Sequence, residues 1–180
     1  MLVRDDRRVV MTNASYAPVH DIDWDFPLWS EILPGLFLGG TDDDDTIEDA
    51  ANIHTSRAIT KDDFDTVVTL YAWANPVDWF VQELRYGFYD SGLEGNADYA
   101  SLHEAAAFAH AAWKSGKRVL IRCQAGINRS SLTMGLALML EGYSSADAIQ
   151  LMRDKRSNAV LLNNDFVDYL HIKDTTTNEK

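Results

Sequence analysis

The sequence contains a single cysteine, Cys123, in 180 residues. One cysteine cannot form an internal disulfide or supply a cysteine-rich zinc cluster, so the fold must depend on its apolar core. Basic residues are also few, since 16 lysines and arginines stand against 28 acidic residues and give a formal net charge of −12. This charge repels nucleic-acid backbones and anionic membranes, so an anionic ligand requires a local binding site.

Long apolar runs are absent as well. No stretch approaches the roughly 18 apolar residues of a membrane-spanning helix, and the opening MLVRDDRRVV lacks the apolar core of a secretory signal. We therefore expect a soluble, cytoplasmic, monomeric protein without a membrane or nucleic-acid partner. The length and the 46% hydrophobic content fit one globular domain. We place it at residues 31–172, between an N-terminal arm (1–30) and a frayed C-terminal tail (173–180).

Strand-like and helix-like segments alternate along the chain, which predicts an α/β domain in three layers around a central sheet. Runs rich in β-branched, aromatic and other apolar residues indicate strands after the Pro34–Gly35 turn and at residues 65–71, 86–90 and 117–123. Apolar spacing and capping residues indicate helices at residues 75–85, 99–115, 130–141, 145–156 and 164–172. The acidic run Thr41–Asp45 lacks the ligand spacing of a calcium-binding loop, and we interpret it as solvated.

The sequence QAGIN lies between Cys123 and Arg129 and joins a buried strand to an apolar helix. In such a turn successive backbone N–H groups point inward and the helix N-terminus adds positive potential, which predicts an anion site. Arg129 adds a planar guanidinium that can hold two phosphate oxygens. The same potential favours the thiolate of Cys123, and Gly126 permits tight curvature and close approach of the backbone to a ligand. The combination indicates a nucleophile directed at phosphorus.

The segment RCQAGINRS resembles the C-x5-R signature loop of the cysteine-dependent phosphatases, and ILPGLFLGG resembles the opening strand of their dual-specificity branch. The resemblance extends from about Ile32 to Leu170 and includes a closing N-x-x-F pattern in NNDFVDYL. It implies a central, mostly parallel sheet of four or five strands with helices on both faces. It also implies catalysis without a metal ion or an organic cofactor.

The resemblance implies a role for individual residues. Cys123 would attack phosphorus to form a phosphocysteine, and Ser130 would hydrogen-bond the thiolate when it leaves. The transition state would be stabilised by the phosphate-binding loop, which comprises Gln124, Ala125, Gly126, Ile127, Asn128 and Arg129. Asp90 occupies the position of the general acid, and Glu94 and Asp98 in the same loop are alternatives.

Arg122 departs from the family pattern, because the family usually has histidine before its cysteine. A similar R-C-Q-A-G-x-N-R-S form occurs in bacterial tyrosine-phosphatase-like proteins, so the resemblance still implies an active enzyme. On a strand, the side chain of Arg122 should point away from that of Cys123.

These observations favour a phosphomonoester hydrolase acting on phosphotyrosine in proteins or peptides, with phosphoserine and phosphothreonine left open. An RNA 5′-triphosphatase or another polyphosphate phosphatase is the alternative, since Asn128 before Arg129 resembles the cap triphosphatases of the same superfamily. A phosphate-binding module without turnover is a third hypothesis. The QAGIN loop carries no lysine or histidine for additional phosphates, which favours a monoester.

Overall fold

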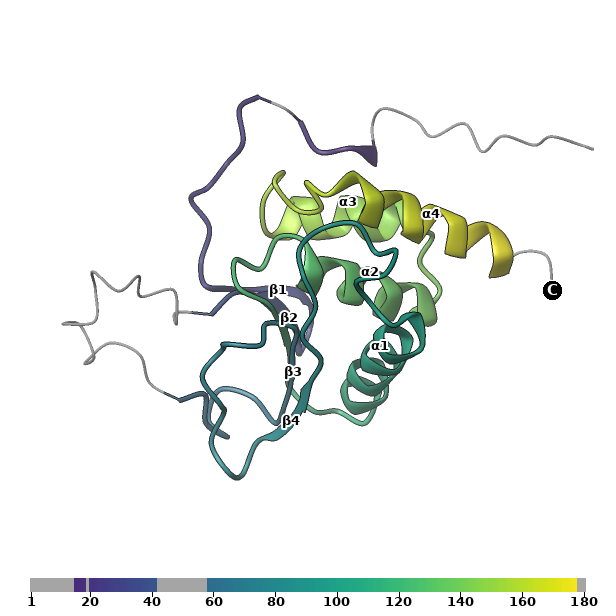
Figure 1. The fold of residues 1–180 in the computed structure, drawn as a ribbon. Helices are drawn as coiled ribbons and strands as arrows, with labels where there is room; N and C mark the ends of the chain where they lie inside the picture. The colour runs from purple at the N-terminus through teal and green to yellow at the C-terminus, as the bar shows by residue number, and fades with distance from the viewer. Residues whose placement is uncertain (1–14, 19, 42–57, 178–180) are drawn as a thin grey trace, which may run out of the picture.

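The computed structural model describes residues 15–18, 20–41 and 58–177 of the chain (Figure 1). Its five strands form one sheet in the order β1-β2-β5-β3-β4. β1 pairs with β2 in antiparallel fashion, and all other neighbours are parallel. The strands are β1 (Trp29–Leu33), β2 (Leu36–Gly39), β3 (Thr66–Thr69), β4 (Gln82–Arg85) and β5 (Val119–Arg122). Apart from Thr41, the predicted acidic loop lies outside the described residues.

β5 is the central strand, and its position explains its composition. All four of its residues are buried, and Leu120 lies in register between Phe37 of β2 and Val67 of β3. A strand covered on both faces requires a continuous apolar run such as VLI. Its carboxyl end leads directly into Cys123, at the edge of a parallel sheet where ligands bind in many α/β folds.

The four helices of the described residues pack on one face of the sheet (Figure 1). There they share one apolar core with β2, β3 and β5. α1 and α2 end just before glycines with positive φ, Gly116 (+85°) and Gly142 (+107°), close to the predicted helix ends at residues 115 and 141. α4 continues past the predicted end near Ile172, so residues 173–177 are helical. The helices are α1 (Tyr99–Lys114), α2 (Arg129–Glu141), α3 (Ser145–Lys155) and α4 (Asn164–Thr177).

The other face of the sheet is covered by loop segments in the part of the chain that the structure describes. Ile59, Phe64 and Val81 form a second core there with Val67 and Leu120 of the sheet. The sheet thus lies between a helical layer and a loop layer. The prediction of a three-layer domain with a four- or five-stranded, mostly parallel sheet is confirmed, and the sheet has five strands. The implied placement of helices on both faces differs, because the described residues place all helices on one face.

The predicted helix at residues 75–85 and the predicted strand at residues 86–90 are both wrong. Residues 75–81 are irregular, β4 occupies residues 82–85, and residues 86–90 form no strand. The spacing of Val81 and Leu84 fits one face of a helix, but the two residues contact the cores on opposite faces of the sheet. On an extended chain, residues three positions apart point to opposite sides. Phe80, which would share that helix face with Val81 and Leu84, is 79% exposed. Pairing with β3 has overridden the local pattern.

The described part of the N-terminal arm packs against the domain. The Tyr16 hydroxyl donates to Asp168 of α4 at 2.7 Å, and Asn158 accepts from the Asp23 N–H at 2.9 Å. Further along, the carbonyl of Pro27 accepts from Arg156 at 3.0 Å. The arm is therefore connected to the C-terminal helices before it enters β1.

Candidate active site

The loop from Cys123 to Arg129, called the signature loop below, is held through its carbonyl groups. Five successive carbonyl oxygens, from Gln124 to Asn128, accept hydrogen bonds from the protein. The donors are Thr41 N (2.9 Å), Arg156 Nη2 (3.2 Å), Arg156 Nε (2.8 Å), Leu161 N (2.9 Å) and Leu132 N (2.8 Å), in that order.

The N–H groups of the same loop remain available. Within the residues that the structure describes, the N–H groups of Ala125, Gly126, Ile127 and Asn128 have no hydrogen-bond acceptor. α2 begins at Arg129, and the side chain of its N-cap, Asn128, makes no capping bond. The carbonyl groups of the loop are bonded to the rest of the protein, and its free N–H groups point to the opposite side. This arrangement forms a cradle for an anion.

Cys123, Arg129 and Ser130 converge on this cradle. Cys123 Sγ lies 3.2 Å from Ser130 Oγ, and both side chains are buried. Arg129 is only 7% exposed; its Nη1 donates to the Phe88 carbonyl at 3.1 Å, and its Nε has no partner among the described residues. A buried guanidinium with an unpaired donor is a site where an anionic oxygen completes the hydrogen bonding.

Gly126 is required by its surroundings. Its φ is +71°, a conformation that disfavours any residue with a Cβ. A Cβ there would also overlap the backbone of Gly39 and the Nη2 of Arg156. The sequence predicted close approach to a ligand, whereas the crowding found comes from the end of β2.

Of the three acidic residues considered as general acid, Asp90 contacts the signature loop. Its Oδ2 accepts from Asn128 Nδ2 at 3.0 Å. Asp98 instead caps α1, accepting from the N–H groups of Ala100 and Ser101. Hydrogen bonds from the Ser101 hydroxyl and from these N–H groups lower the pKa of Asp98 below its ordinary value. A capping carboxylate whose ionised form is favoured in this way is a poor proton donor.

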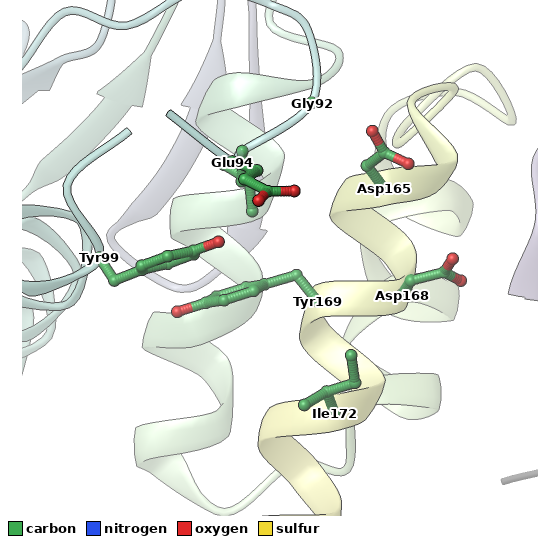
Figure 2. A pocket seen from close by; sticks show the side chains of 8 residues that line it. Gly92, Glu94, Tyr99, Asp165, Asp168, Tyr169 and Ile172 are labelled. Carbon is green, nitrogen blue, oxygen red and sulfur yellow. The ribbon is translucent and has the colours of Figure 1, made fainter. Parts of the chain in front are cut away.

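Glu94 faces a different part of the molecule. It lines a cavity of about 450 Å³ between the loop after Asp90 and α4 (Figure 2). The rings of Tyr99 and Tyr169 are stacked beside it with centroids 5.2 Å apart, and Asp165 projects from α4 on the other side. No residue of the signature loop lines this cavity. Burial raises the pKa of Tyr169 to about 12, so its hydroxyl stays protonated.

Sequence reasoning missed Arg156, the residue that holds the back of the signature loop. Besides the carbonyls of Ala125 and Gly126, its guanidinium donates to Ser30 Oγ at 3.0 Å and lies 4.5 Å from the ring centroid of Phe26. Burial lowers the pKa of Arg156 to about 10, while the charge of Cys123 opposes that shift. In the sequence it looks like an ordinary basic residue at a helix end, and only long-range contacts distinguish it.

Arg122 points away from Cys123, as strand alternation predicts. It is buried on the loop-covered face, where its Nε donates to Thr69 Oγ1 at 3.0 Å and its Nη2 to the Asn75 carbonyl at 2.6 Å. Its Nη2 also lies 3.4 Å from a carboxylate oxygen of Glu83. Its charge is therefore committed within the protein rather than to the cradle.

A second cavity of about 270 Å³ opens beside Arg129. Its walls are apolar and aromatic, and they are formed by Ala72, Trp73, Gly87, Phe88 and Tyr89.

Among the described residues, no group of three or more histidine, cysteine, aspartate and glutamate side chains could hold a metal ion. Within the same residues, no helix has the length and apolar character needed to span a membrane.

Comparison with known families identifies the domain. The sequence profile of the dual specificity phosphatase catalytic domain matches residues 79–175, which is more than half of the chain. The chain therefore belongs to the dual-specificity phosphatase family, and its domain is that of a cysteine-dependent phosphatase. A search among curated proteins finds no match.

Solved structures share the fold. Human DUSP28 is 24% identical, with a TM-score of 0.64, and the match covers 84% of this chain and 96% of that one. The human tyrosine phosphatase-like serine/threonine/tyrosine-interacting protein is 19% identical, with a TM-score of 0.62 and coverage of 83% and 97%. PTPMT1 in complex with PI(5)P is 17% identical, with a TM-score of 0.63 and coverage of 86% and 100%. At these identities the likeness establishes the fold alone.

Replacing Arg156 with methionine is expected to destabilise the domain. The change leaves buried carbonyl groups without donors, and we expect a loss of about 2–5 kcal/mol in the free energy of unfolding, measured with urea. Lys155→Met is the matched control, because Lys155 is exposed, and its effect should stay within about 0.5 kcal/mol. Equal effects of the two substitutions would show that Arg156 does not hold the loop.

Proposed function

We propose that the protein hydrolyses phosphotyrosine in proteins or peptides through a phosphocysteine intermediate on Cys123. The observation that carries this proposal is the row of five occupied carbonyl groups in the signature loop, which leaves its N–H groups open around the cysteine. Membership of the dual-specificity phosphatase family supports the reaction class.

In the first step the thiolate of Cys123 attacks phosphorus, and an S–P bond forms as the bond to the leaving oxygen breaks. Asp90 donates its proton to that oxygen. Arg129 and the open N–H groups of the loop stabilise the charge on the three equatorial oxygens of the transition state. These donors are fixed before the substrate arrives, so little reorganisation is required during the reaction.

In the second step water attacks the phosphocysteine while Asp90, now ionised, takes its proton. The S–P bond breaks and the thiolate leaves. Ser130 Oγ, 3.2 Å from Cys123 Sγ, donates a hydrogen bond to the developing thiolate. Phosphate and the starting protonation states of Cys123 and Asp90 are regenerated.

The cavity beside Arg129 supports an aromatic monoester as substrate. Trp73 and Tyr89 line it and are each 71% exposed, so their rings can contact a substrate ring. The loop carrying Trp73 is held by Arg85, which donates to the Ala74 carbonyl at 2.7 Å, and by Arg122 through Asn75. Because the backbone of this loop is held in place, less entropy is lost from the loop when a substrate binds.

The alternative, a triphosphate-ended RNA or another polyphosphate, requires further cations near the cradle. Arg122, the nearest in sequence, is buried on the opposite face beside Glu83. The additional phosphates would then meet a protein of net charge −12 with few compensating groups. We therefore prefer phosphotyrosine as the substrate, and the experiment below compares it with the polyanionic substrates.

Turnover on a substrate panel tests the proposed function. We expect kcat/KM for a phosphotyrosine peptide to exceed that for triphosphate-ended RNA and for phosphoinositide vesicles by at least about tenfold at fixed ionic strength. Cys123→Ser should abolish turnover on every substrate, because a serine hydroxyl is not ionised by this site. A higher value for RNA or lipid would promote the alternative, and residual activity in the serine variant would refute the covalent mechanism.

Trp73→Ala is expected to weaken phosphotyrosine binding. Loss of one aromatic contact should raise KM for the peptide by about three- to tenfold, with little change on phosphoserine peptides. Trp79→Ala is the matched control, since Trp79 is 98% exposed and does not line the cavity. The same effect on both substrates would argue against an aryl-binding role.

Asp90→Asn tests the general acid. We expect a loss in kcat of roughly a hundredfold on phosphotyrosine, whose phenolate requires a proton, and a smaller loss on p-nitrophenyl phosphate, which leaves readily. Glu94→Gln, in the same loop but facing the α4 cavity, should change neither rate by more than about twofold. If Glu94→Gln shows the selective loss instead, the acid is Glu94.

A further inference from the structure

Asn128 joins the signature loop to the loop of Asp90. Its Nδ2 donates to Asp90 Oδ2 at 3.0 Å, and its Oδ1 accepts from the backbone N–H of Asn163 at 3.0 Å. A backbone N–H can only donate, so the carboxamide oxygen must face Asn163. This contact fixes the orientation of the amide and turns its NH2 group toward Asp90.

Asn128 is also the N-cap of α2, but its side chain does not cap the helix. An asparagine in this position normally accepts a hydrogen bond from a backbone N–H of the first turn and so stabilises the helix. Here the amide is committed to Asp90 and Asn163 instead. The first-turn N–H groups of α2 consequently stay free of that side chain and available to an anion.

The Asp90 carboxylate has no other side-chain partner within the described residues. The backbone of its loop is held separately. Asn96 accepts from the Tyr89 N–H at 3.1 Å and donates to the Gly92 carbonyl at 3.1 Å. Asn163 Nδ2 donates to the Ser91 carbonyl at 3.2 Å. The loop can therefore keep its shape without Asn128, whereas the carboxylate loses its orientation.

We propose that Asn128 is a positioning residue that selects which oxygen of Asp90 carries the transferable proton. This inference rests on the proposed function, in which Asp90 is the general acid. Because Asn128 donates to Oδ2, that oxygen remains an acceptor and the proton resides on Oδ1. Oδ1 then gives the proton to the leaving oxygen as the P–O bond breaks, and in the second step it takes one from the attacking water.

A double-mutant cycle between Asn128→Ala and Asp90→Asn tests this role. We expect Asn128→Ala to lower kcat/KM for a phosphotyrosine peptide by about tenfold and for p-nitrophenyl phosphate by less than about threefold. In the Asp90→Asn background the same change should cost nothing further on either substrate. Asn163→Ala is the control, because it removes the contact with Ser91 and keeps the backbone N–H that faces Asn128; the ratio between the two substrates should stay at the wild-type value.

Asn128→Asp provides a second variant if Asn128→Ala does not fold. It keeps the acceptor for the Asn163 N–H but places a carboxylate against Asp90. The added negative charge beside the cradle should lower kcat/KM for both substrates, and the loss on phosphotyrosine should still exceed the loss on p-nitrophenyl phosphate by the same ratio as in Asn128→Ala. Equal losses on both substrates, or a loss that persists in the Asp90→Asn background, would overturn the inference and leave the proposed function standing. If Asp90→Asn itself shows no selective loss on phosphotyrosine, the acid assignment fails and the inference falls with it.

Discussion

The candidate site depends on hydrogen bonds to the outer side of the signature loop. Each peptide unit points its carbonyl and its N–H in opposite directions, so holding the carbonyls of residues 124–128 directs the following N–H groups into the cradle. The donors come from the end of β2, the end of α3, the segment before α4 and the first turn of α2. The candidate anion site therefore depends on the packing of the whole domain, although its residues form one short stretch of sequence.

Secondary structure was predicted correctly where the residues of the element itself carry the signal. The apolar run of β5 indicates a buried strand, and the glycines at 116 and 142 mark helix ends, because glycine readily adopts positive φ. The prediction for the residues of β4 was wrong because their structure is determined by a distant part of the chain. Residues 75–85 carry a helix-like spacing, and the strand exists only because β3 offers a hydrogen-bonding edge that is distant in the sequence.

The same distinction applies to the site. Cys123, Arg129 and Ser130 lie within one strand–loop–helix unit, and the direction of Arg122 follows from strand alternation. Arg156 and the link from Asn128 to Asp90 could not be predicted in this way. Both connect segments more than 25 residues apart, and their residue types have common alternative uses at helix ends.

The guanidinium of Arg156 is shared between the N-terminal arm and the signature loop, which has a thermodynamic consequence. It donates to the carbonyl of Pro27 in the arm and to that of Gly126 in the loop, beneath the ring of Phe26. Any change in affinity for phosphate that results from docking of the arm must be matched by an equal effect of phosphate on the docking equilibrium, because linkage is reciprocal. The arm and the signature loop thus share the hydrogen-bond donors of a single cation.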